Sequence, residues 1–425
     1  MSLHMTALRM VLYVLLSGNT PTIIQLPPRV MRLWETNVTP LIERPVWRGN
    51  ISRYDATHLL MVPMHAAFEL NQPAWQRAFL SHFKGFVSAR PPKDFAPADE
   101  ISWLQYYYFA SQFLTLSASH GKPVPAGLPE FLTEQVIDFW TSRSAWQWAR
   151  APFTGMRERL TWKLSPGTAR KSYYKGVIDH EEFLFAITAD LVRYDRLTGR
   201  RDPSAKTLRE ILDTARKVYD QRVVFHSDGG WLFQPGVWAD HPEYLYAGRD
   251  RKIARMAPAP LADVAEDVSH SFRRPLWLLS LRGGARDNAE AAYYDDLRLR
   301  LDKQFFAHIL TPPTASFPAY RLTNWMDGRN GVYRWGYSNR GSTWGYGPYQ
   351  LSSTFTLGWW TFLGTPRIKA AYADEGGRFP LSPNVLATYF PDLTDTSTAS
   401  ARAVADPLMG FRELIVLLSA RIPGS

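Results

Sequence analysis

The chain has 425 residues, of which 45% are hydrophobic and 21% are charged, so it can bury a sizeable core and wholesale disorder is excluded. It contains no cysteine, which excludes disulfides, thiolate metal sites and cysteine nucleophiles. The 49 Lys and Arg outnumber the 39 Asp and Glu and give a net charge of +10. This charge favours an anionic partner such as nucleic acid, an anionic membrane surface or an acidic polysaccharide. A basic surface without a specific partner is the alternative.

The beginning of the chain is expected to form an N-terminal segment, residues 1–30, ahead of a single helical domain, residues 31–425. Met1–Met5 resembles a cloning scar. The apolar run Met10–Leu16 follows Arg9 and resembles a shortened secretory signal, which favours a secreted or periplasmic location. A terminal strand or helix packed on the domain is the alternative. No segment reaches the length that a transmembrane helix needs.

Apolar residues recur at three-and-four spacing in several stretches, which predicts a mainly α protein. The predicted helices span residues 54–70, 74–89, 100–119, 128–143, 179–197, 204–224, 267–282, 286–309 and 349–363. They form pairs that return about every 50 residues, which is typical of an α/α toroid, either incomplete or a six-hairpin barrel, or of an open solenoid. We favour the toroid because two long loops, at about 226–262 and 311–348, are rich in aromatic residues and glycine, and long ordered loops are usually functional.

The 16 Trp, 20 Tyr and 23 Phe exceed what core packing requires, so some of these rings are expected to face a ligand. The segment Tyr320–Tyr349 interleaves aromatic residues with four arginines. Rings offer stacking faces and guanidinium groups offer forked donors, a combination that suits sugars. The candidates in this segment are Trp335, Tyr337, Asn339, Arg340, Trp344 and Tyr346. The alternative is a small β-hairpin element whose rings pack as a lid over the helices.

The segment Phe225–Gly248 supplies four more candidate sugar-binding residues, Trp231, Trp238, His241 and Tyr244. A basic stretch, Arg143–Lys175, is expected to be a solvated face or, as the second choice, an anion-binding rim. The spacing of the Asp and His residues supports no defined metal site, and no cofactor motif is present, so neither a metal nor a cofactor is expected.

Two acidic residues stand at predicted helix starts. Asp267 and Ser269 are candidate caps of the helix that follows them, or they join His270 in placing an acid, a hydroxyl and an imidazole at a helix mouth. Asp179 opens an earlier helix. Asp179 and Asp267 are therefore candidates for an acid and base pair that hydrolyses a glycosidic bond.

The segment Asp267–His270 before a helix, the Gly229–Trp231 loop and the aromatic lid resemble the α/α-toroid superfamily of carbohydrate-active enzymes across residues 54–363. That superfamily includes glycoside hydrolases, polysaccharide lyases and sugar epimerases. In its lyases, a tyrosine or histidine removes the proton beside a carboxylate that arginine, asparagine or histidine neutralises. The residue types that match these roles are His270, Tyr337, Asn339 and Arg340.

The first hypothesis is therefore an enzyme that cleaves an acidic, uronate-containing polysaccharide by β-elimination. Arg340 and Asn339 would neutralise the uronate, while His270 or Tyr337 removes the C5 proton and Tyr337 returns it to the leaving oxygen. Hydrolysis through the two carboxylates is the close alternative. A non-catalytic protein that binds glycan or nucleic acid is the hypothesis from another class, and the absence of a recognised nucleic-acid module disfavours the nucleic acid.

Overall fold

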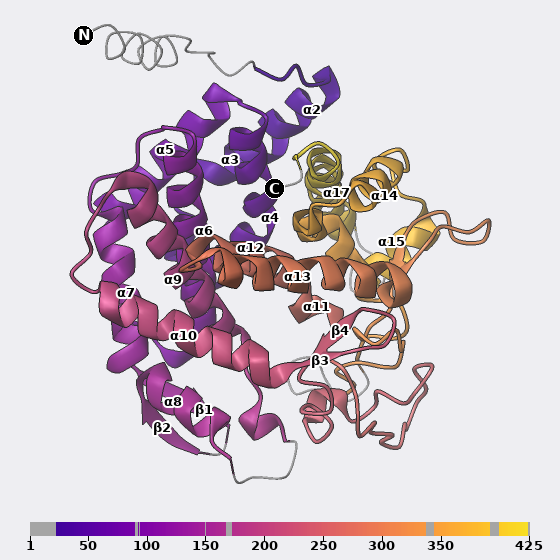
Figure 1. Ribbon diagram of the computed structural model, residues 1–425. Helices are drawn as coiled ribbons and strands as arrows, with labels where there is room; N and C mark the ends of the chain where they lie inside the picture. The colour runs from indigo at the N-terminus through magenta and orange to yellow at the C-terminus, as the bar shows by residue number, and fades with distance from the viewer. Residues whose placement is uncertain are drawn as a thin grey trace, which may run out of the picture.

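The computed structural model describes residues 23–89, 92, 94–148, 150–166, 172–336, 344–391 and 399–423, and it confirms a mainly α fold. Across these ranges the chain is dominated by helices (Figure 1), and its named strands form three two-stranded sheets beside a few isolated β-bridges. None of the described helices combines the length and the apolar character needed to span a membrane.

The helices vary from short turns to 21 residues. The first half of the chain contains α2 (Pro28–Leu33), α3 (Thr39–Ile42), α4 (Asn50–Glu69), α5 (Pro73–Ser88), α6 (Glu100–Ser119), α7 (Leu128–Thr141), α8 (Gly155–Leu164), α9 (Asp179–Thr198) and α10 (Ala205–Arg222). The second half contains α11 (Val268–Ser271), α12 (Arg274–Gly284), α13 (Asn288–Gln304), α14 (Pro366–Gly376), α15 (Pro383–Tyr389) and α17 (Ala399–Ser419). The antiparallel strand pairs are β1 (Ser144–Gln147) with β2 (Arg150–Thr154), β3 (Val223–Phe225) with β4 (Trp231–Phe233), and β5 (Leu310–Thr311) with β6 (Arg321–Leu322).

Four helices, α4, α6, α9 and α12, lie side by side in that order. They run in the same direction, because cavities at the two ends of the group are lined by their starts and by their ends. The first turns of α4, α6 and α9 line one cavity, together with the short helix α11 that precedes α12. The last turns of the four helices line a second cavity of about 460 Å³. Each of the four contacts the helix that follows it, which is α5, α7, α10 or α13. The later part of the chain packs beside them, because α17 contacts both α4 and α14. The N-terminal ends of several helices therefore meet at one end of the molecule.

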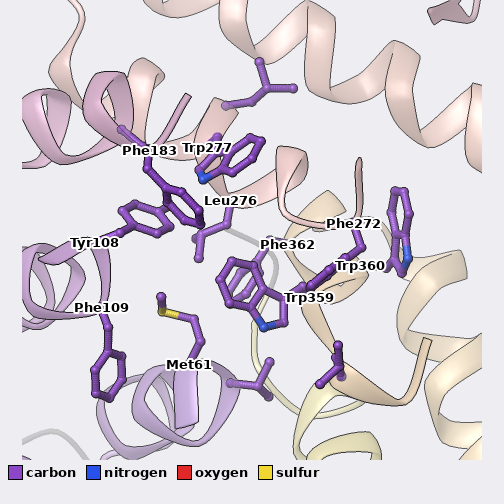
Figure 2. Close-up of a cluster of buried hydrophobic side chains, with 14 of the residues drawn as sticks. Met61, Tyr108, Phe109, Phe183, Phe272, Leu276, Trp277, Trp359, Trp360 and Phe362 are labelled. Atoms are coloured by element: carbon purple, nitrogen blue, oxygen red, sulfur yellow. The ribbon is translucent and has the colours of Figure 1, made fainter. Parts of the chain in front are cut away.

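The hydrophobic core lies between these helices and is rich in aromatic rings (Figure 2). Met61 of α4, Phe109 of α6, Phe183 of α9 and Trp277 of α12 are almost completely buried, and the rings of Phe183 and Trp277 meet edge to face at 5.1 Å. Trp359 packs in the same cluster and donates a hydrogen bond of 3.1 Å to a backbone oxygen of α4. Many of the numerous aromatic residues of the chain thus pack in the core.

Two predicted helices differ from the structure. The helix predicted at 267–282 is split into α11 and α12, with Phe272 and Arg273 between them. The α-helix predicted at 349–363 is wrong, because this segment forms two 3₁₀ helices, Ser352–Leu357 and Trp359–Leu363. Gly358 separates them with a positive φ of 80°, and a Cβ atom there would clash with Ser419 of α17.

In the described part of the basic stretch Arg143–Lys175, most of the basic side chains form contacts within the protein. Arg159 and Lys163 of α8 are buried and bind the same oxygen of Glu181, in the first turn of α9, at 2.8 and 2.7 Å. Arg157 pairs with Glu210 of α10. These ion pairs tie α8, and the β1–β2 hairpin before it, to the N-terminal end of α9 and to α10.

Candidate functional site

A cavity of about 310 Å³ lies at the N-terminal ends of α4, α6, α9 and α11. The helix starts contribute Tyr54, Ile101, Asp179, His180 and His270 to its lining. The loops contribute Trp148, Trp238, His241, Glu243, Tyr244, Glu266 and Arg334. Helix N-termini carry the positive end of the helix dipole, so this end of the molecule favours negative charge in a ligand.

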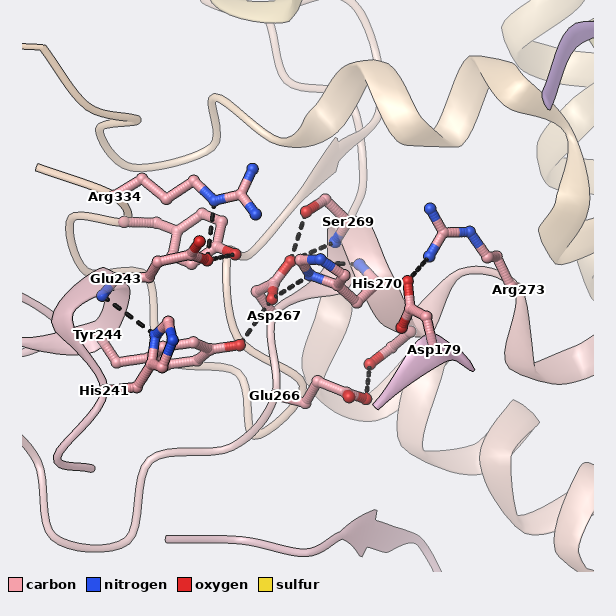
Figure 3. A network of polar contacts seen from close by, with 12 residues as sticks. Asp179, His241, Glu243, Tyr244, Glu266, Asp267, Ser269, His270, Arg273 and Arg334 are labelled. Atoms are coloured by element: carbon pink, nitrogen blue, oxygen red, sulfur yellow. Dashed lines mark hydrogen bonds and ion pairs between the residues drawn. The ribbon is translucent and has the colours of Figure 1, made fainter. Parts of the chain in front are cut away.

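Asp267 and His270 form the central pair of the polar network (Figure 3). Asp267 is completely buried and caps α11, accepting hydrogen bonds from the backbone N–H groups of Ser269 and His270 at 2.9 and 3.2 Å and from the Ser269 hydroxyl. Its other oxygen accepts from His270 Nδ1 at 2.7 Å and from the Tyr244 hydroxyl at 2.8 Å. Both carboxylate oxygens are thus fully used within the protein.

These contacts fix the protonation of both partners. Burial opposes the charged form of His270, but the carboxylates of Asp267 and Asp179 prevail and raise its pKa to about 9. Burial likewise opposes ionisation of Asp267, yet the imidazolium and the Ser269 hydroxyl hold its pKa well below the usual range. His270 is therefore an imidazolium at neutral pH. Its side chain is 28% exposed and lines the cavity, so it can donate to a ligand.

Asp179, the first residue of α9, forms an ion pair with Arg273. The same guanidinium donates to the hydroxyl of Tyr54 at 2.8 Å and reaches the ring nitrogen of His58 at 3.1 to 3.2 Å. Arg273 itself is only 1% exposed, and although burial opposes its charge, Tyr54 and Asp179 raise its pKa. Arg273 therefore joins α4, α9 and the start of α12 beneath the cavity.

A second arginine, Arg274, organises the inner wall. It is buried and binds Glu182 at 2.8 Å and Glu266 at 2.9 Å, while the hydroxyl of Ser271 donates to Glu266 at 2.6 Å. Burial raises the pKa of Glu182 to about 7 despite its ion pair. Glu266 lines the cavity, but its carboxylate is thus already bound by an arginine and a hydroxyl.

The third carboxylate of the lining, Glu243, is bound by two residues from the aromatic segment. It accepts from the Tyr333 hydroxyl at 2.7 Å and from Arg334 Nε at 2.8 Å. Burial opposes its ionisation, but Arg334 and Tyr333 hold its pKa below the usual value. This cluster fastens the loop around residue 334 to the loop around residue 243, so that Arg334 lines the cavity.

Two further histidines in the lining are neutral, unlike His270. Burial lowers the pKa of His180 to about 4, and its Nδ1 atom is buried with no hydrogen-bond partner among the described residues. Burial also lowers the pKa of His241, whose Nδ1 accepts from the backbone N–H of Glu243 at 3.3 Å. One cavity thus combines a protonated imidazole with neutral ones.

The structure brings together only some of the predicted site residues. Asp179, Trp238, His241, Tyr244 and His270 line the cavity, and Asp267 lies directly behind His270 and Tyr244.

The other predicted residues fall elsewhere. Trp231 lies in the core and donates from its indole to the backbone of Leu297 at 2.7 Å. Trp335, Trp344 and Tyr346 are half-buried around an isolated antiparallel bridge between Tyr333 and Tyr346, outside the cavity lining. Tyr337, Asn339 and Arg340 lie outside the described residues.

Sequence reasoning missed several site residues, namely Tyr54, Trp148, His180, Glu243, Glu266 and Arg334. Tyr54 and Glu266 did stand near helix starts, and Arg334 stood within the aromatic segment, so position gave a partial signal. Nothing in the local sequence distinguishes Trp148 from the other tryptophans, because its place in the lining depends on how the hairpin packs.

The described residues contain no group of three or more histidine or acidic side chains that could hold a metal ion. Comparisons of the chain with protein-family models, with curated proteins and with solved structures gave no match.

Proposed function

We propose that this protein is an enzyme that cleaves an acidic, uronate-containing polysaccharide by β-elimination. The observation that carries the proposal is that His180 and His270 line one cavity in opposite surroundings. Asp267 binds Nδ1 of His270 at 2.7 Å and raises its pKa, whereas burial lowers the pKa of His180, whose Nδ1 has no partner among the described residues. Groups whose environments separate their pKa values in this way are suited to act as the base and the acid of one reaction.

His270 is the acid in this proposal. It carries a proton at neutral pH and is held by Asp267, so it can protonate a leaving oxygen and then take up another proton. The sequence had suggested His270 as a base, but a histidine with a raised pKa seldom has the free nitrogen lone pair that a base needs. We therefore assign the base to another residue.

His180 is the base in this proposal, since its imidazole is neutral and ready to accept a proton. An imidazole with a pKa of about 4 is by itself a weak base. The carboxylate of a bound uronate would raise this pKa, because an opposite charge favours the protonated form. An acidic substrate would thus raise the pKa of the base that acts on it.

The reaction balances without a co-reactant. The C5 proton passes to His180, the electron pair of the C5–H bond forms the C4–C5 double bond, and the C4–O bond breaks. His270 gives its proton to the departing oxygen. Arg334, at the cavity wall, and Asn339 and Arg340 further along the same segment are proposed to neutralise the uronate carboxylate. Trp238, whose buried indole N–H has no partner among the described residues, can donate to a sugar hydroxyl.

Hydrolysis by Asp179 and Asp267 has weaker support. A glycosidase needs one carboxyl group that holds a proton and another that is open to water or to the sugar. Asp267 is completely buried and accepts five hydrogen bonds, and Asp179 is paired with Arg273. Neither carboxylate is therefore free in the manner that this mechanism requires.

The proposal extends to the fold, for which we propose an α/α toroid. The order of contacts α4, α6, α9 and α12, each followed by an outer helix, supports it. The contact of α17 with α4 supports closure of the ring through the C-terminal part of the chain.

The test is turnover of a panel of uronate polymers, followed by the ultraviolet absorbance of the new C4–C5 double bond, beside a reducing-end assay on neutral glycans. His180→Gln and His270→Gln should each lower kcat by roughly 10²- to 10⁴-fold on the polymer that is cleaved. His308→Gln is the matched control, because His308 also pairs with an aspartate, Asp228, but outside the cavity. New reducing ends without the double bond would refute β-elimination in favour of hydrolysis. Binding without either product would indicate a glycan-binding protein.

A further inference from the structure

We propose that Trp146 is a stacking platform for a sugar unit outside the cavity, so that the protein binds a polymer of several units rather than a single terminal sugar. This inference rests on the proposed function, since it extends the same site along the β1–β2 hairpin. In Figure 1 this hairpin and the loops after β4 lie at the same end of the molecule.

The position of Trp146 on the strand carries the argument. Side chains alternate between the two faces of a strand, and β1 shows alternating exposed and buried residues, with Trp146 on the exposed face. Trp148 follows two residues later and lines the cavity. The two indoles are 6.4 Å apart between ring centres and inclined at 69°. Trp148 therefore belongs to the cavity wall, whereas Trp146 lies on the hairpin outside the cavity.

Trp148 is the fixed link between the cavity and Trp146. Its ring meets those of Tyr173, Trp238 and His241 at centroid distances of 5.2, 6.1 and 5.3 Å. Trp238 and His241 also line the cavity. The side chain of Trp146, by contrast, is the outermost ring of this series and is 50% exposed.

Buried polar contacts hold the backbone beneath this exposed ring. Arg159 donates to the carbonyl oxygen of Trp146 at 2.8 Å while it also binds Glu181 at the start of α9. The neighbouring Gln147 is buried and donates to the carbonyl oxygen of Tyr174 at 2.9 Å. The backbone that carries this large exposed ring is thus held in place before a ligand arrives, so binding costs little further backbone freedom.

The surroundings indicate that this ring recognises the face of a sugar rather than negative charge. Arg159, which contacts the backbone of Trp146, is already bound to the carboxylate of Glu181. An indole offers a flat apolar face with an electron-rich π system, which suits the C–H face of a pyranose ring. The binding contributed by Trp146 should therefore depend little on salt, unlike contacts to phosphates or carboxylates.

The experiment compares Trp146→Ala with Phe225→Ala, which removes another exposed ring, 52% accessible, on β3 and outside the cavity lining. We expect Trp146→Ala to weaken retardation in native gels that contain the uronate polymer. We also expect it to raise the ratio of the polymer KM to the KM of a short oligosaccharide roughly tenfold, at low and at high salt alike. Phe225→Ala should change neither quantity, and Trp146→Phe should retain most of the binding of the wild type.

Equal behaviour of the Ala variants at positions 146 and 225 would overturn the inference, as would a loss that vanishes at high salt. A wild-type protein that is retarded by the polymer but forms no double bond would refute β-elimination alone, because the gel comparison still tests Trp146. A wild-type protein that neither binds nor cleaves any uronate polymer would overturn both proposals.

Discussion

Replacing Asp267 by asparagine isolates the charge of the central pair, because asparagine is as good an N-cap as aspartate and can still accept from the backbone of α11. In the wild type, the pKa of His270 stands at about 9 instead of the ordinary 6.5. This difference corresponds to about 3 kcal/mol in favour of the imidazolium. Burial lowers the pKa of His270, and the carboxylate of Asp267 opposes this effect. Without that carboxylate, the pKa of His270 should fall toward or below its ordinary value.

The same change should alter how stability depends on pH. A histidine with a raised pKa in the folded state contributes stability that is fully present below pH 6.5 and is lost as the pH rises to about 9. Near pH 6, Asp267→Asn should lower the free energy of unfolding by about 3 kcal/mol, as expected when one partner of a buried pair is removed. The difference from the wild type should shrink toward pH 9.

Two measurements check this reasoning. Titration of the imidazole C–H signals by NMR gives the pKa of His270, and urea unfolding between pH 6 and pH 9 gives the stability. Asp228→Asn is the control, because it breaks an exposed Asp–His pair, with side chains 42% and 35% accessible, and should cost much less. If the pKa of His270 stayed near 9 in the Asp267→Asn variant, or if both variants lost the same stability, the pair would not be the source of the shift.

Three further outcomes are expected. Glu181→Gln leaves two buried cations without their carboxylate and should cost about 3 to 5 kcal/mol in urea unfolding; an unchanged midpoint would contradict this. Gly284→Ala places a Cβ within 2.7 to 2.8 Å of α9 and should cost about 1 to 3 kcal/mol, whereas Gly377→Ala, whose nearest atom is at 3.4 Å, should change melting little. If β-elimination occurs, kcat/KM should decline above about pH 9 as His270 loses its proton, and His270→Gln should lack that decline.

The helical part of the fold could be predicted because its periodicity is local. The starts of α6 and α9, at Glu100 and Asp179, agree with the predicted boundaries at 100 and 179. The prediction failed where tertiary packing decides the backbone. The segment after Tyr349 has apolar residues at helical spacing, but Gly358 must adopt a positive φ to let α17 approach, and this contact partner is distant in sequence.

The site was predictable only in its local elements. Asp267, Ser269 and His270 are neighbours in sequence, so a cap and an acid–imidazole pair could both be anticipated, and the structure contains both. Arg273 could not be placed, because its partners Asp179 and Tyr54 are 94 and 219 positions away. The amino-acid composition likewise does not show whether an aromatic ring faces a ligand or the core.

The charges around the cavity compensate one another more closely than the net charge of +10 implies. Asp179 pairs with Arg273, Glu243 with Arg334, and Glu266 with Arg274, while the buried Asp267 balances His270. We therefore propose that a bound anion depends on donors that are already oriented, namely the imidazolium, the convergent helix starts and the guanidinium of Arg334, rather than on an excess of positive charge. Because every carboxylate in this set is already engaged, the proposed mechanism gives the proton transfers to the imidazoles. The carboxylates of Asp267 and Asp179 raise the pKa of His270, the proposed acid, whereas burial lowers the pKa of His180, the proposed base.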